Sequence, residues 1–154
     1  MNSPVNVLVD SSFLLPTLGV KVAQISDSDL RELAKLRSRV TFLCLYQSLV
    51  EVLGKVASAA ASDKSALETI EAGLRSLLES GVYTWVSPSV RALVEALEMR
   101  RKGHGDMIDN MLYAAASERR ALFLSLDKDL IEFLAKNDYS IENVVDIRRL
   151  RSLA

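Results

Sequence analysis

Short apolar runs alternate with amphipathic segments along this chain, and the alternation limits the folds that it can adopt. The predicted strands lie in residues 5–10, 40–44, 82–88, 121–126 and 144–147. The predicted helices are residues 27–37, 46–61, 63–81, 89–102, 106–119 and 127–136. Strands separated by helices pair in parallel, with helices on both faces of the sheet. We therefore predict an α/β fold, a three-layer sandwich around a central, mostly parallel sheet of four or five strands.

The composition indicates the size of the domain and limits how the chain could bind nucleic acid. The 154 residues are 49% hydrophobic and 25% charged, which predicts a single domain over residues 1–154 with a full core. The formal net charge is only -1, whereas proteins that coat nucleic acid through charge alone are strongly basic. Nucleic-acid binding would therefore need a local basic patch or a metal ion.

The chain has one cysteine, Cys44, which excludes an intrachain disulfide and a thiolate zinc cluster. This cysteine usage suits a reducing cytoplasm. The N-terminal residues show no basic stretch before an apolar run, and no apolar stretch has the length of a membrane span. We therefore expect a cytoplasmic protein with no membrane partner.

Acidic residues follow two of the predicted buried strands. Asp10 closes the first apolar run, and Asp127 comes just after the run ALFLSL. Sites in open parallel sheets form outside the carboxyl ends of the strands, so both acids should lie at one edge. Asp127 can also cap the helix that follows it, and this reading remains open.

Three further acids are expected at the same edge. Glu51 lies off the apolar face of the helix that leaves the second strand. Asp106 and Asp109 open the helix that runs back before ALFLSL, so its N-terminus points at the strand ends. Either can be explained by its place at the helix start alone, Asp106 as a cap and Asp109 as a first-turn acid. The pattern does not decide between them as a direct metal ligand.

Several carboxylates at one edge repel one another, and a divalent cation with oxygen ligands relieves that repulsion. Such an ion can polarise a phosphoryl oxygen and activate a water molecule, which favours phosphodiester hydrolysis. Strand-end acids also occur in phosphoaspartate receivers and related phosphatases. The sequence Asp10-Ser11-Ser12 lacks the Asp-x-Asp pair that is usual in those phosphatases.

Three segments resemble motifs of the PIN-domain nucleases, and together they span most of the chain. VLVDSSFLL resembles the opening motif of a strand, an aspartate and a small hydroxyl residue. SLVEVLGKV resembles the helix that carries the family glutamate. DMIDNMLYAAASERRALFLSLDKDL resembles the closing half, except that Leu130 stands where the family usually has phenylalanine.

The resemblance implies a Mg²⁺- or Mn²⁺-dependent endoribonuclease. The residues that it implies as catalytic metal ligands are Asp10, Glu51, Asp109 and Asp127, with Asp106 as an additional metal-site acid. Ser12 and Ser125 would be supporting hydroxyls. Small members of the family include VapBC-type toxins, which implies an antitoxin partner and a homodimer as further expectations. The alternative is a catalytically silent PIN-like domain that binds RNA or a protein.

A basic cluster precedes the acidic helix and is a candidate for contacts with RNA phosphates. It consists of Arg100, Arg101, Lys102 and His104. The competing interpretation is an ordinary solvated helix end, where cations also suit the helix dipole.

Overall fold

The structure is a computed structural model that describes residues 3–60 and 63–154, and it contains one parallel sheet of five strands. The strands are β1 (Val5–Val9), β2 (Val40–Leu45), β3 (Tyr83–Val86), β4 (Leu122–Leu124) and β5 (Val144–Val145). Their order across the sheet is β3-β2-β1-β4-β5, and every neighbouring pair is parallel. The predicted parallel sheet is therefore confirmed, with β1 at its centre.

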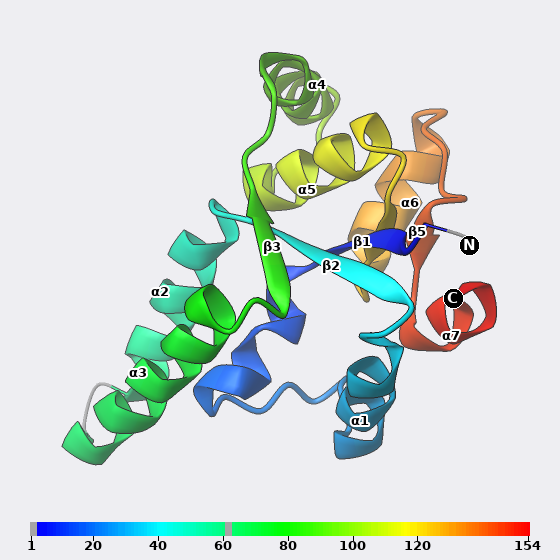
Figure 1. Ribbon diagram of the computed structural model, residues 1–154. Coiled ribbons are helices and arrows are strands. Elements are labelled where there is room, and N and C mark those ends of the chain that lie inside the picture. Colours follow the sequence, from blue (N-terminus) through cyan, green and yellow to red (C-terminus); the bar gives the residue numbers. More distant parts are fainter. Residues whose placement is uncertain (1–2, 61–62) are drawn as a thin grey trace.

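Helices cover both faces of this sheet, as Figure 1 shows. The α-helices are α1 (Asp27–Leu36), α2 (Ser48–Ala60), α3 (Lys64–Glu79), α4 (Val90–Arg101), α5 (Met107–Glu118), α6 (Lys128–Lys136) and α7 (Ile147–Leu153). Two short 3₁₀ helices follow β1, namely η1 (Ser11–Phe13) and η2 (Leu15–Leu18). The predicted three-layer α/β sandwich is confirmed, while Ala61 of the predicted second helix lies outside the described residues.

The central strand supplies both halves of the core because successive side chains of a strand point to opposite faces. Val7 and Val9 are buried beneath the layer that contains α1, α2, α3 and α7. Leu8 is fully buried on the other face, in the cluster that α4, α5 and α6 complete. Burial on both faces explains why β1 is continuously apolar apart from Asn6 at its start.

The helices begin at residues whose side chains accept hydrogen bonds from the first turn. Ser26 and Asp29 form a reciprocal capping box at the start of α1. Asp63, Ser89 and Asp146 cap α3, α4 and α7 in the same general way. These side chains satisfy amide groups that have no partner inside the helix, and they therefore set where each helix starts.

One local prediction is wrong. The last predicted strand, residues 144–147, ends at Val145, and the chain then turns into α7. The serines after β1 form the 3₁₀ helix η1. On α2, Val52 and Val56 are buried, while Leu53 is 43% exposed.

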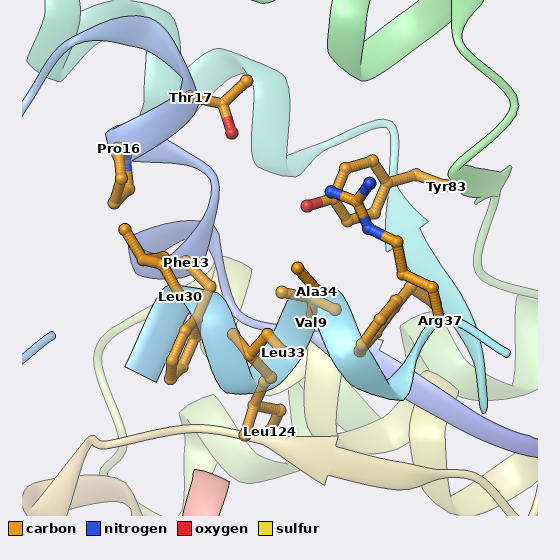
Figure 2. Close-up of a pocket in the computed structure, with 11 residues that line it drawn as sticks. Val9, Phe13, Pro16, Thr17, Leu30, Leu33, Ala34, Arg37, Tyr83 and Leu124 are labelled. Atoms are coloured by element: carbon orange, nitrogen blue, oxygen red, sulfur yellow. The ribbon is translucent and has the colours of Figure 1, made fainter. Parts of the chain in front are cut away.

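The helix α1 does not close completely onto the sheet. A cavity of about 200 Å³ lies between α1, the 3₁₀ helices and the strands, as Figure 2 shows. Its floor includes Val9 and Leu124, and the Arg37 and Tyr83 side chains lie at one side. Within residues 3–60 and 63–154, no helix is long and apolar enough to cross a membrane.

Candidate metal centre at the carboxyl edge of the sheet

The centre of the site is Asp10, which directly follows the middle strand. Val9 of β1 is paired with Leu124 of β4, so the residues after each strand end lie side by side. The Ser125 hydroxyl donates to Oδ2 of Asp10 at 3.1 Å, and the Asp10 amide donates to the Leu124 carbonyl at 3.0 Å. Asp10 is only 5% exposed. Parallel strand pairing thus holds a buried carboxylate at the edge of the sheet.

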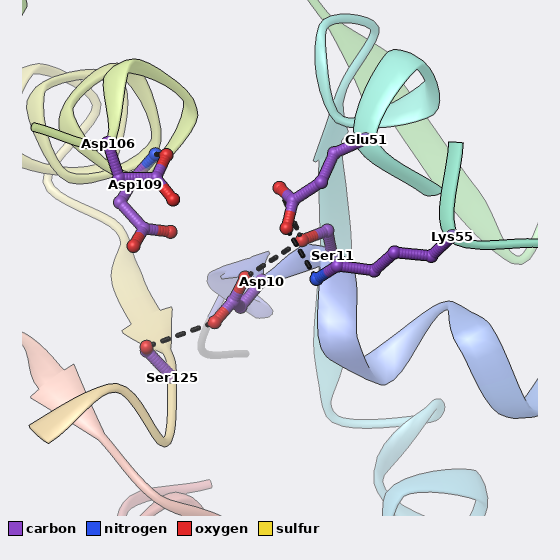
Figure 3. Close-up of polar contacts among 7 residues, drawn as sticks. All are labelled: Asp10, Ser11, Glu51, Lys55, Asp106, Asp109 and Ser125. Carbon is purple, nitrogen blue, oxygen red and sulfur yellow. Dashed lines mark hydrogen bonds and ion pairs between the residues drawn. The ribbon is translucent and has the colours of Figure 1, made fainter. Parts of the chain in front are cut away.

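Glu51 is connected to Asp10 through one buried hydroxyl group. The Ser11 Oγ lies 2.9 Å from Oε2 of Glu51 and 3.2 Å from Oδ1 of Asp10. Figure 3 shows this hydroxyl between the two carboxylates. Because a serine has a single hydroxyl proton to donate, it bridges the two acids instead of satisfying each of them separately.

Asp106 and Asp109 approach from the opposite side, at the start of α5 (Figure 3). Asp106 is the N-cap, and its Oδ1 accepts a hydrogen bond from the Asp109 amide at 3.1 Å. Asp109 is buried, with 6% of its surface exposed. Capping and membership of the acid cluster are therefore compatible, because the helix start is itself at the edge of the sheet.

Asp127 also caps a helix and belongs to the acid cluster. Its Oδ1 accepts from the Leu130 amide at 3.0 Å and caps α6, while its own amide donates to the Ser125 hydroxyl at 3.2 Å. The Ser125 hydroxyl therefore contacts both the first and the last acid of the cluster. This link fixes the loop after β4 relative to the end of β1.

The acids surround one open cavity of about 260 Å³. Its lining residues are Asp10, Ser12, Val22, Gln24, Glu51, Lys55, Asp106, Asp109, Leu126 and Asp127. All five acids predicted from the sequence are among them. The structure therefore brings together carboxylates from segments that are far apart in the chain.

Burial and crowding alter the acidity of these carboxylates. Burial raises the pKa of Asp10, and the nearby charges of Glu51 and Asp127 act in the same direction. Burial is also the main cause that raises the pKa of Asp109 to about 9, aided by its hydrogen bond with Asp127. Burial acts to raise the pKa of Asp127 as well, but hydrogen bonds from Asp109 and backbone amides lower it overall. Asp109 therefore carries the proton that this pair shares.

The cluster fits a hard divalent cation in the type and number of its donors. Mg²⁺ prefers carboxylate oxygens and water, and five acidic residues line this cavity. The side chains that would hold the ion are Asp10, Glu51, Asp109 and Asp127. In the conformation described over residues 3–60 and 63–154, no group of three or more acidic, histidine or cysteine side chains is arranged to hold a metal ion.

Two residues that contact the acids, Ser11 and Lys55, were not predicted from the sequence. Ser12 lines the cavity as expected, but Ser11 makes the hydrogen bonds to Asp10 and Glu51. Lys55 also lines the cavity, with its Nζ 2.6 Å from Oε1 of Glu51. Its spacing of four residues from Glu51 on a helix was a usable signal for this ion pair.

The predicted basic cluster lies outside the cavity. Arg101 forms an ion pair with Glu98, and the Lys102 Nζ lies 4.7 Å from the centre of the Tyr139 ring. Neither these side chains nor Arg100 lines the acid cavity. Their contact with RNA stays a prediction.

His104 takes part in the packing beside α5. Its Nδ1 lies 2.6 Å from Oδ1 of Asn110, and its ring centroid is 5.1 Å from that of Phe133. His104 does not line the cavity itself.

Solved structures with this arrangement of strands and helices come from several organisms. PAE2754 from Pyrobaculum aerophilum is 17% identical with a TM-score of 0.61, and the match covers 97% of this chain and 88% of that one. A toxin–antitoxin complex from Klebsiella pneumoniae is 12% identical with a TM-score of 0.53, over 92% and 97%. VapBC2 from Rickettsia felis, bound to a DNA fragment from its promoter, is 16% identical with a TM-score of 0.57, over 92% and 96%.

At the level of sequence, no protein-family model and no curated protein matches this chain. The three structural matches cover nearly all of it, but their identities are low enough that they establish the fold alone. The resemblance drawn from the sequence motifs is thus confirmed for the architecture. The chain has the three-layer, PIN-like α/β fold that these solved structures share.

Proposed function

We propose that this protein is a divalent-metal-dependent endoribonuclease that acts in the cytoplasm. The observation that carries the proposal is the convergence of five acidic residues on one cavity at the carboxyl edge of the sheet. Two of them, Asp10 and Asp109, are buried. Burying a carboxylate costs free energy unless a partner compensates its charge. The burial of two carboxylates at one edge of the sheet therefore supports a role in binding a cation.

Bound Mg²⁺ or Mn²⁺ would polarise a phosphate oxygen and lower the pKa of a bound water molecule. The protein's contribution is to hold the acids in place. Ser11 and Ser125 donate to the two oxygens of Asp10 and fix the plane of its carboxylate. The Leu130 amide donates to Oδ1 of Asp127 and restricts the orientation of that carboxylate. Arg100, Arg101, Lys102 and His104 are proposed to contact RNA phosphates beyond the cavity.

The test is cleavage of a generic single-stranded RNA with Mg²⁺, Mn²⁺ or EDTA. Asp10→Asn removes the central charge while it keeps the size of the side chain, so we expect cleavage to be abolished with the fold retained. Asp138→Asn is a matched control, because Asp138 is exposed and its φ of 61° suits asparagine. Cleavage by Asp10→Asn at the wild-type rate would refute the proposal.

A silent PIN-like module that binds RNA or a protein is the second candidate. It is favoured by the conformation of the acids, which within the described residues do not form an arrangement that could hold a metal. Calorimetric titration with Mn²⁺ separates the two functions, because only the nuclease requires the metal. Absence of binding would favour the module.

We further propose a protein partner of the antitoxin kind. One structural match is a toxin–antitoxin complex, and another is VapBC2. The α4 surface formed by Leu93, Val94 and Leu97 is 38%, 58% and 60% exposed, which supports an interface there, including one with a second copy of the chain. Sedimentation of the purified protein tests the homodimer.

A further inference from the structure

Lys55 is a cationic residue with acidic surroundings. It is the only cationic side chain among the described residues that line the acid cavity. It lies one helical turn after Glu51, and its Nζ is 2.6 Å from Oε1 of that acid. Figure 3 shows its side chain extended toward the carboxylates of Glu51 and Asp10. The cavity thus already contains one positive charge.

This ion pair engages a side chain that the proposed function requires for the metal. Oε1 of Glu51 accepts from Lys55, and Oε2 accepts from Ser11. Both oxygens of the acid therefore lie within hydrogen-bonding distance of protein donors. The charge of Lys55 also interacts favourably with Asp10, which lies on another wall of the cavity.

The other ion pairs within helices of the described part of the chain lie outside the acid cavity. The pair between Lys35 and Glu32 has a similar length, 2.9 Å, and comparable spacing along α1. Neither residue lines the acid cavity, and 71% of the Lys35 side chain is exposed. Removing Lys35 therefore removes a similar ion pair without changing the charge of the acid cluster.

We propose that Lys55 is a built-in competitor for the divalent cation: its ammonium group binds Glu51 in the metal-free protein, and the metal ion must displace it. The inference rests on the proposed function, because it concerns the affinity of the same site. Its consequence is a site that fills only at a high concentration of free cation. Exchange of one cation for another also keeps the acids compensated at every stage.

The size of the effect follows from Coulomb's law. A unit charge about 6 Å from a divalent ion, at an effective dielectric constant of about 40 to 80, changes the affinity of that ion roughly tenfold to a hundredfold. Neutralising Lys55 should therefore tighten metal binding by at least about tenfold. A lysine that merely supported the fold would have the opposite effect or none.

The experiment is calorimetric titration of Mn²⁺ into the metal-free 154-residue protein at pH 7, without RNA. Lys55→Met removes the charge and keeps the length of the side chain, Lys55→Gln is a second neutral variant, and Lys55→Arg retains the charge. We expect both neutral variants to bind Mn²⁺ at least about tenfold more tightly than wild type. Lys55→Arg and the control Lys35→Met should bind as wild type does.

Each outcome bears on a separate claim. Binding by Lys55→Met with wild-type or weaker affinity would overturn the competitor role and leave the nuclease proposal intact. Binding by Lys55→Met alone, with none by wild type, would support the competitor role strongly. Absence of binding by wild type and by both neutral variants would overturn the metal site itself, and the inference with it. Circular dichroism of each variant confirms that the comparison is between folded proteins.

Discussion

Substitution of Asp109 by asparagine should change how the stability of the metal-free protein depends on pH. Burial and the hydrogen bond with Asp127 raise the pKa of Asp109 to about 9, from an ordinary value of 3.8. The folded protein thus keeps a proton that the unfolded chain releases between these pH values. The contribution of Asp109 to the free energy of unfolding is therefore fully present below about pH 3.8 and is lost as the pH rises toward 9.

One proton taken up on folding corresponds to a loss of about 1.4 kcal/mol in the free energy of unfolding per pH unit. Between pH 6 and pH 8 the loss from Asp109 is therefore at most about 3 kcal/mol. Asparagine does not titrate and retains a donor toward Asp127. The pKa of Asp127 is lowered, so its own titration lies below this pH range and does not contribute.

The assay is urea unfolding in EDTA at pH 6, 7 and 8, for wild type and Asp109→Asn. All other ionisable groups are common to both proteins, so the difference in their free energies of unfolding isolates this site. Between pH 6 and pH 8, we expect the free energy of unfolding of Asp109→Asn to rise relative to that of wild type by roughly 2–3 kcal/mol. A constant difference would refute the reasoning, because it would mean that Asp109 is ionised throughout.

Four substitutions test other parts of the structure. Gly73→Ala should lower the melting temperature at a cost of about 1–3 kcal/mol, because the added Cβ would lie 2.4 Å from the Thr17 carbonyl oxygen; an increase would contradict this. Ser11→Ala should reduce RNA cleavage by about tenfold to a hundredfold while Ser12→Ala changes it little, since only Ser11 bridges two acids; the reverse order would favour the sequence-based assignment. Ser26→Ala should destabilise by about 1 kcal/mol in urea unfolding through loss of its cap, and an unchanged midpoint would exclude that role.

The strands and most helices could be predicted because their signals are local. A buried strand such as β4 is a short apolar run, and residues such as Asp63 and Ser89 mark helix starts through their side-chain oxygens. α7 could not be separated from the strand before it by these rules. It has seven residues, of which only Ile147 and Leu150 are buried, so it offers too little periodicity.

The arrangement of the acids was predictable from topology, and the contacts between them were not. Parallel strands end at the same edge, so Asp10 and Asp127 had to lie near one another once the sheet was parallel. Which serine faces the acids depends on the rotation of the 3₁₀ helix that begins at Ser11, and side-chain type alone does not define that rotation. The orientation of the Lys55 side chain could not be predicted either, because a long side chain on a helix can turn toward the site or toward water.

The position of β1 has a consequence for the synthesis of this protein. β1 is made first, yet it lies in the middle of the sheet, between β2 and β4. The hydrogen bond from Ser125 to Asp10 joins residues that are 115 positions apart. A chain still being translated therefore cannot assemble the acid cluster until β4 and the start of α6 have emerged from the ribosome. Until then the proposed metal site lacks Asp127, and the proposed cleavage of RNA cannot take place.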